Sequence, residues 1–239
     1  MPSLFITGTD TNVGKTIVTR ALLQTLAQYD VPVVPYKPIA CGGAEELPTE
    51  LPQDDYASED NSDVLTLLKS TLPQVQYREI NSYTFTHSST PVFAALDAVR
   101  HIHVEKLNYD LTRLQKKYHN ILVEGTYGWL TPINKDFSFA DWVQQNKMPV
   151  ILVVGIKEGC ANHALLTAQA IKASGVPLIG WVANRINPGL RHYVELVEML
   201  TQKIDAPLLG QIPYIGRPEE KELHQFIQNP NPLLHYFHK

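Results

Sequence analysis

The 239-residue sequence has few cysteines, no long apolar run and no basic segment. Its two cysteines, Cys41 and Cys160, have neither metal-site spacing nor the number that a disulfide framework needs. The longest apolar stretch, residues 150–155, is far too short to cross a bilayer, and the first residues do not resemble a secretory signal. The formal net charge is −4 without a basic patch, which argues against a nucleic-acid surface. We therefore expect a cytoplasmic protein with no membrane or nucleic-acid partner.

The length and the apolar content fit one domain of ordinary size. Hydrophobic residues make up 44% of the chain, which is enough to fill the core of one α/β domain. No composition shift divides the sequence, so we expect residues 1–239 to form a single domain.

The first sixteen residues carry the most informative motif. An apolar run ends at Gly8, a loop follows that closes with Gly14, Lys15 and Thr16, and good helix formers occupy residues 21–27. Such a loop turns backbone N–H groups toward a polyphosphate, Lys15 neutralises the outer phosphates, and the Thr16 hydroxyl holds Mg²⁺. The usual pattern has its first glycine where Thr9 stands, so the loop is one residue longer than usual.

Apolar runs alternate with helix-forming segments along the rest of the chain. Runs of strand character occupy residues 31–38, 81–85, 120–125, 149–155, 177–184 and 208–214, and helices are expected at 64–68, from 91, at 161–173 and at 190–203. This order predicts an α/β fold with a largely parallel central sheet, helices on both faces and right-handed crossovers. The acidic, proline-containing stretch 44–60 is expected to be an exposed loop.

Four polar residues are candidates for the site, and three of them stand near the ends of these runs, where ligands bind in parallel α/β sheets. Lys37 precedes a proline and is expected at a strand end, as a ligand contact or as a solvated lysine. Glu124 ends a buried run, which favours Mg²⁺ coordination over a capping role. Asp63 lies in a helix's first turn, where it binds a metal or only complements the helix dipole. Asn184 is suited to a base edge or to a turn.

Taken together, the motifs resemble those of the dethiobiotin synthetase family of P-loop enzymes. The carrying segments are residues 8–16 (GTDTNVGKT), 36–40 (YKPIA), 61–63 (NSD), 123–125 (VEG), 159–169 (GCANHALLTAQ) and 180–184 (GWVAN). The resemblance implies an ATP-dependent ligase that carboxylates 7,8-diaminononanoate with CO₂ or bicarbonate and closes a ureido ring. The reaction would pass through a carbamate and a carbamic-phosphoric anhydride, releasing ADP and phosphate.

The resemblance also implies a set of site residues. Lys15 and Lys37 would be the catalytic cations, and Thr16, Asp63 and Glu124 would hold Mg²⁺. The ATP site would comprise Asn12, Val13, Gly14, Lys15, Thr16, Ile17, Asp63, Glu124, Gly125, Thr126, Tyr127, Asn184, Pro213, Tyr214, Ile215 and Glu219. The diamine would contact Thr11, Lys37 and Cys41, with Asn162 contributed by the second subunit of a homodimer.

Three other functions fit the same loop. Another P-loop cyclo-ligase or amidoligase would share the fold and the nucleotide site but take a different acceptor. A dimeric ATPase switch similar to ParA or MinD would carry a lysine where this chain has Asp10, and a basic amphipathic segment that is missing here. A catalytically silent paralogue would not be expected to retain Lys15, Lys37, Asp63 and Glu124 together.

Overall fold

The computed structural model describes residues 2–42 and 61–238, and the predicted acidic loop 44–60 lies outside them. The first half of the fold comprises β1 (Ser3–Gly8), α1 (Lys15–Gln28), β2 (Val34–Cys41), α2 (Ser62–Leu68), α3 (Tyr77–Ile80), β3 (Asn81–Phe85), α4 (Pro91–Asp97), α5 (Val104–Tyr118) and β4 (Ile121–Glu124). The second half comprises α6 (Phe139–Gln145), β5 (Val150–Ile156), α7 (Cys160–Ala173), β6 (Leu178–Arg185), α8 (Tyr193–Lys203), β7 (Leu208–Ile212), the 3₁₀ turns η1 (Pro218–Glu220) and η2 (His224–Phe226), and α9 (Asn231–Phe237).

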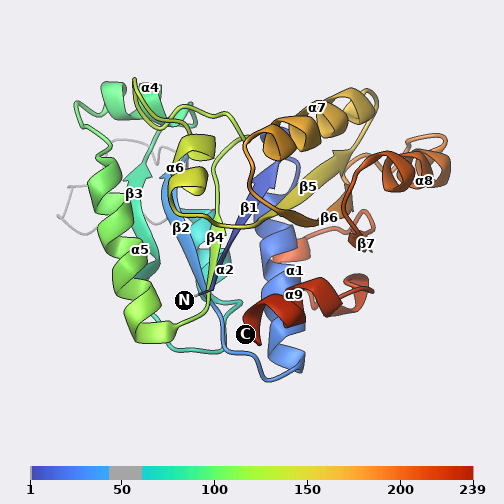
Figure 1. Ribbon diagram of the computed structural model, residues 1–239, viewed down its shortest axis with the longest axis horizontal. Helices are drawn as coiled ribbons and strands as arrows, with labels where there is room; N and C mark the ends of the chain where they lie inside the picture. Colours follow the sequence, from blue (N-terminus) through green and yellow to red (C-terminus); the bar gives the residue numbers. More distant parts are fainter. Residues whose placement is uncertain (1, 43–60, 239) are drawn as a thin grey trace, which may run out of the picture.

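One parallel sheet runs through the described residues. Its strand order is β3-β2-β4-β1-β5-β6-β7, and every pairing between these strands is parallel. β1 lies in the middle, so the loop that follows it emerges at the centre of the carboxyl edge (Figure 1). The predicted α/β fold with a parallel central sheet is confirmed.

The central strands are buried on both faces, which explains their continuous apolar runs. Successive strand side chains point to opposite faces, so each run supplies both cores. Val150 and Leu152 of β5 belong to one apolar cluster, whereas Ile151 and Val153 belong to the other. α5, α6, α7 and α8 cover the first face, while α1 and α9 cover the second (Figure 1). The predicted helices on both faces are thereby confirmed.

The two ends of the described chain are tied to each other, away from the loop edge. The Tyr236 hydroxyl of α9 accepts a hydrogen bond from the Ser3 amide at 3.2 Å and donates one to the Ser3 carbonyl at 3.1 Å. In Figure 1 both termini lie at the lower edge of the sheet, whereas β1 points upward. The C-terminal helix therefore braces the start of the central strand.

The second strand differs from the sequence prediction, which ended it at Pro38. β2 begins at Val34 and continues to Cys41, so Lys37 lies in its middle. Its first residues pair with β4, and the segment from Lys37 onward pairs with β3. Because β4 stops at Glu124, opposite this point, Lys37 still faces the carboxyl edge of the sheet. The pairing with β3 is what extends the strand beyond the proline.

Other predicted boundaries were also wrong, and β7 ends at Ile212 rather than at residue 214. α8 begins at Tyr193, whereas the sequence predicted a helix from residue 190. A turn occupies Pro188 and Gly189, and the N-cap residue His192 adopts a left-handed conformation, so the helix cannot start earlier. β6 extends one residue past Asn184 to Arg185.

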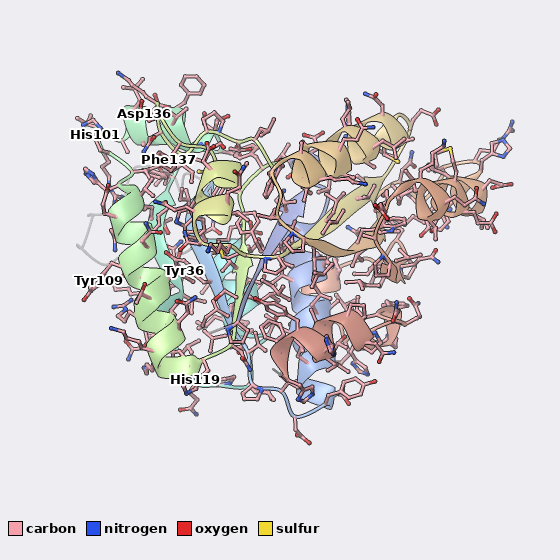
Figure 2. All side chains as sticks on the ribbon, viewed as in Figure 1. Tyr36, His101, Tyr109, His119, Asp136 and Phe137 are labelled. Atoms are coloured by element: carbon pink, nitrogen blue, oxygen red, sulfur yellow. The ribbon has the colours of Figure 1, made fainter. Side chains whose placement is uncertain are left out.

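Some of the labelled side chains lie outside the site. Figure 2 shows Tyr36 inside the fold and His101 at its periphery. The Tyr36 hydroxyl is 2.6 Å from the Ser82 hydroxyl, and burial raises the pKa of Tyr36. His101 and His103 are both exposed. Among the described residues, no helix has the length and hydropathy that a membrane crossing requires.

Candidate functional site

The loop between β1 and α1 has the backbone of an anion-binding site. Asn12 and Gly14 adopt left-handed conformations with φ of 53° and 85°, and α1 begins at Lys15. Left-handed residues that alternate with residues of negative φ turn successive N–H groups to one side, beside the positive end of the helix dipole. The Lys15 ammonium folds over the loop and donates to the Asp10 carbonyl at 2.9 Å. The loop therefore has the backbone geometry that a phosphate cradle needs, and its binding of phosphate stays a prediction.

Gly8 allows this loop to fold back against its own strand. A Cβ atom there would lie 2.7 Å from Val13 Cγ2 and 3.2 Å from Lys15 Cδ, closer than side chains pack. The glycine one residue outside the usual pattern thus has a steric reason in the longer loop. Lys15 is only 7% exposed, and burial, followed by the charge of Lys37, lowers its pKa to about 8.

Lys37 joins two acidic residues from different elements. Its ammonium donates to Glu124 Oε1 at 2.6 Å and to Asp63 Oδ2 at 3.0 Å. Lys37 is 3% exposed and Glu124 is fully buried, whereas the Asp63 side chain is 45% exposed. Burial alone would lower the pKa of Lys37, but the charges of Glu124 and Asp63 outweigh it and hold the pKa above its ordinary value. Lys37 is therefore a fixed cation.

The position of Asp63 follows from the cap of a short helix. The Asn61 side-chain oxygen accepts hydrogen bonds from the Asp63 amide at 3.0 Å and the Val64 amide at 3.3 Å. This N-cap aims the first turn of α2 at Lys37. Burial would raise the pKa of Asp63, but Lys37 holds it below its usual range. The carboxylate therefore stays ionised at neutral pH.

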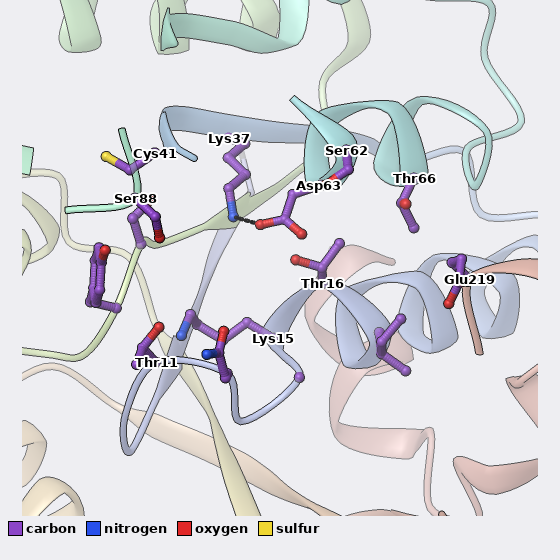
Figure 3. A pocket seen from close by; sticks show the side chains of 15 residues that line it. Thr11, Lys15, Thr16, Lys37, Cys41, Ser62, Asp63, Thr66, Ser88 and Glu219 are labelled. Carbon is purple, nitrogen blue, oxygen red and sulfur yellow. Dashed lines mark hydrogen bonds and ion pairs between the residues drawn. The ribbon is translucent and has the colours of Figure 1, made fainter. Parts of the chain in front are cut away.

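These side chains surround a cavity of about 550 Å³. Figure 3 shows Lys37 reaching toward Asp63, with Lys15 and Thr16 beside them, Cys41, Ser88 and Thr11 at one end, and Thr66 and Glu219 at the other. The lining residues are Thr11, Asn12, Gly14, Lys15, Thr16, Ile17, Lys37, Cys41, Ser62, Asp63, Thr66, Ser88, Thr126, Tyr127 and Glu219. Most of the predicted site thus converges on one cavity.

Three of these lining residues were missed from the sequence: Ser62, Thr66 and Ser88. Ser62 adjoins Asp63, and Thr66 follows Asp63 by three positions on α2. Helical spacing could therefore have indicated that both lie near Asp63. No local pattern marked Ser88, which lies in an exposed connection after β3 and reaches the site by its tertiary position.

A second cavity of about 200 Å³ adjoins the first and shares Gly14 and Ile17 with it. Its remaining lining residues are Asn184, Arg185, Ile186, Ile212, Pro213, Tyr214, Ile215 and Pro218. The Asn184 side-chain amide donates to the Val13 carbonyl at 2.9 Å, which ties the end of β6 to the loop. The residues predicted for a nucleobase therefore lie together.

Gly14 offers a direct test of this contact. An added Cβ would overlap the Asn184 side-chain amide, and φ of 85° already disfavours a side chain. We expect Gly14→Ala to cost about 1 kcal/mol for the conformation plus about 2 kcal/mol for the overlap, and to weaken ATP binding. Gly175→Ala is the matched control, because Gly175 has φ of 74° and no neighbour within 4 Å. Urea unfolding measures both variants, and equal losses would contradict the steric argument.

The segment that borders the second cavity is anchored to α1. The Arg20 guanidinium donates to the Lys221 carbonyl from Nε at 3.1 Å and from Nη2 at 2.9 Å, and it donates to the Ser70 hydroxyl at 2.8 Å. Gln24 accepts from the Leu223 amide at 2.7 Å. These bonds hold the chain that carries Glu219 against the helix that begins at the loop.

Four of the predicted residues line neither cavity. Val13 is fully buried and contributes its carbonyl to Asn184. Glu124 and Gly125 lie behind the lining, where Glu124 accepts from the Thr16 hydroxyl at 2.8 Å. Asn162 is exposed at the start of α7.

Cys41 lies in the cavity as a neutral thiol. Burial raises its pKa to about 12, although the nearby charge of Lys37 acts in the opposite direction. Because the thiolate is the nucleophilic form, Cys41 is not set up as a nucleophile.

Comparison with known proteins gives high similarity over the whole chain. The family model described as AAA domain matches residues 2–221. An ATP-dependent dethiobiotin synthetase from Haemophilus ducreyi is 72% identical over 239 residues, which is 100% of this chain and 86% of that protein. A second one, from Pasteurella multocida, is 55% identical over 240 residues, covering 98% of this chain and 97% of that protein.

Solved structures share the fold at low identity. The MinD cell division protein of Aquifex aeolicus superposes with a TM-score of 0.54 at 17% identity, covering 95% of this chain and 93% of that one. A ParA family ATPase from Chlorobium tepidum has a TM-score of 0.53 at 14% identity, covering 96% and 92%. At such identities the likeness establishes the P-loop fold and says nothing of the reaction.

Proposed function

The chain belongs to the family of ATP-dependent dethiobiotin synthetases, and from that premise we propose how its residues carry the reaction. It is an enzyme that forms dethiobiotin at the expense of ATP, as the resemblance in its motifs indicated. In our proposal, one amine of 7,8-diaminononanoate takes up CO₂ as a carbamate, whose oxygen attacks the γ-phosphate of ATP and displaces ADP. The second amine then attacks the resulting anhydride, closing the ureido ring as phosphate leaves.

The observation that carries this proposal is the pair of buried ammonium groups in one cavity. A carbamate and a triphosphate repel each other, so their reaction needs positive charge fixed in advance. Lys15 folds over the phosphate loop, and Lys37 reaches the same cavity from β2, where Glu124 and Asp63 hold it. We propose that Lys15 binds the outer phosphates and that Lys37 faces the carbamate and the transferring phosphoryl group.

The donor set beside Lys37 fits a Mg²⁺ ion. Glu124 Oε2 is buried and makes no hydrogen bond within the described part of the chain. The Thr16 hydroxyl donates to Glu124 Oε1, and Asp63 shares Lys37 with Glu124. Among residues 2–42 and 61–238, no cluster of three His, Cys, Asp or Glu side chains forms a full protein cage, which suits an ion that keeps water and phosphate ligands. Thr16, Asp63 and Glu124 would hold Mg²⁺, which would neutralise charge on the phosphate oxygens.

We assign the nucleotide to the loop and the second cavity. Asn12, Gly14, Thr16 and Ile17 would contact the phosphates, together with the backbone at Gly125, Thr126 and Tyr127. Asn184, Pro213, Tyr214 and Ile215 would surround adenine, and Glu219 would reach the ribose. The support is that the two cavities are joined at Gly14 and Ile17, so one extended ligand can occupy both.

We assign the diamine to the end of the large cavity near Thr11 and Cys41. Its distant carboxylate would dock at the exposed start of α7, around Asn162, on a second subunit. Asn162 is solvent-exposed and outside both cavities of its own chain, which is consistent with a role across a homodimer interface. We place this homodimer in the cytoplasm, where ATP is supplied.

The test is the complete reaction. Purified protein with ATP, Mg²⁺, bicarbonate and 7,8-diaminononanoate should yield dethiobiotin, ADP and phosphate in equal amounts. Omitting the diamine or the bicarbonate should stop ATP turnover. Diamine-independent turnover would instead indicate an ATPase switch, and an amide product from another amine would indicate a different ligase.

A further inference from the structure

Tyr127 has a strained backbone at the edge of the large cavity. Its φ is 62°, a left-handed conformation that a bulky side chain rarely adopts. The residue lines the cavity, is half-buried, and its phenol makes no hydrogen bond to another described residue. Strain of this kind persists only where the surroundings impose it, and it concentrates at functional sites.

The residues on both sides of Tyr127 impose that conformation. The Thr126 hydroxyl donates to the Ile39 carbonyl of β2. On the other side, the Gly128 amide donates to the Thr131 hydroxyl at 2.9 Å. Trp129 is buried and packs edge-on against Phe5 of β1, with ring centroids 6.3 Å apart. The chain that leaves β4 is therefore held at Thr126 by β2 and at Trp129 by β1, and Tyr127 lies in the turn between these two anchors.

These anchors place Tyr127 at one end of the cavity. Ile39 lies between Lys37 and Cys41 on β2, and a Cβ on Gly128 would be 3.5 Å from the Gly8 carbonyl. Tyr127 thus lies between the end of β2 and the start of the phosphate loop. Figure 3 shows Cys41, Ser88 and Thr11 gathered at this end, opposite Thr66 and Glu219.

This end of the cavity differs from the rest in charge. Its lining side chains are neutral, whereas Lys15, Lys37, Asp63 and Glu219 border the centre and the other end. A polyphosphate is drawn to the cations, which leaves the neutral end for the aliphatic chain of the acceptor. An aromatic ring fixed at that position limits the width available to such a chain.

We propose that Tyr127 is a specificity-determining residue whose ring forms the wall against the methylene chain of the diamine, and that the strained turn holds the ring there. This inference rests on the proposed function. It assigns the ring of Tyr127 to the acceptor, while the backbone of the same residue stays with the phosphates, and it gives the ring, not the hydroxyl, the main role.

Three substitutions test this role. Tyr127→Ala and Tyr127→Gly both remove the ring, and Tyr127→Phe keeps it. We expect the KM for 7,8-diaminononanoate to rise about tenfold in the Ala and Gly variants, as for a lost apolar contact, with the KM for ATP changed less than twofold. Tyr127→Phe should retain both values within about twofold. The Gly variant should melt at a higher temperature than the Ala variant, because only glycine tolerates the turn.

The outcomes separate this inference from the proposed function. If wild-type protein shows no diamine-dependent ATP turnover, the proposed function fails. If it shows such turnover but the Ala and Gly variants keep the wild-type KM for the diamine, the role of Tyr127 is refuted. A parallel rise of both KM values would show that the Tyr127 ring contacts the nucleotide. Equal melting temperatures of the Ala and Gly variants would show that the turn is not strained.

Discussion

Replacing Lys37 with glutamine is expected to lower kcat for dethiobiotin formation by about a thousandfold while ATP affinity changes less than about threefold. Lys37 projects from β2 rather than from the phosphate loop, and its charge is held in place by Glu124 and Asp63. A neutral amide would fill the same space without stabilising the charge that develops as carbamate and phosphate meet. The loss should therefore fall on the chemical step.

The same substitution is expected to destabilise the free protein. Glu124 is fully buried, and removing one partner of a buried ion pair costs about 3–5 kcal/mol. Urea unfolding without ligand measures this loss, and single-turnover kinetics with ATP titration measure the other two effects. Lys172→Gln is the matched control, since its pair with Asp205 is exposed on both sides and contributes little. A parallel loss of ATP affinity and kcat would instead indicate that Lys37 binds the nucleotide.

Replacing Lys15 with alanine is expected to weaken ATP binding by about a hundredfold or more, the equivalent of one charge-assisted contact to phosphate. Lys15 projects from the first residue of α1 over the loop, and its ammonium reaches the Asp10 carbonyl. Calorimetric titration with ATP gives the affinity. Lys157→Ala is the control, because Lys157 contacts the same Asp10 at 3.2 Å but is 38% exposed. An unchanged affinity in the Lys15 variant would contradict the phosphate-loop assignment.

The pH dependence of ATP binding identifies the same group. Burial lowers the pKa of Lys15 to about 8, so the free protein loses this positive charge as the pH rises through that value. Binding a polyphosphate favours the charged form, and ATP affinity should therefore fall above pH 8, by up to about tenfold per pH unit, and be level below it. In Lys15→Ala the affinity should not depend on pH in this range. A wild-type affinity that is level through pH 9 would argue against a charged Lys15 in the complex.

The sequence by itself determined the features that depend on neighbouring residues. Phosphate binding by the loop needs a strand, a glycine-bounded turn and a helix in direct succession, so residues 3–16 contained the whole motif. The buried strands could also be predicted, because a strand covered on both faces must be apolar throughout. The motifs were also enough to indicate the family, which the full-length relatives then established.

The tertiary structure decided which distant residues meet. Lys37 contacts Asp63 and Glu124, 26 and 87 positions away, only because β2 runs past the end of β4 and α2 is capped toward the same edge. The sequence ended β2 too early, since its pairing with β3 is not a local property.

The strain at Tyr127 could not be predicted from the sequence either. It arises because Thr126 is bonded to β2 and Trp129 packs against β1, on the two sides of the turn. Local patterns fix conformation through short-range sterics and hydrogen bonds. The balance of charge in this cavity instead depends on strand pairing between segments that the sequence keeps far apart.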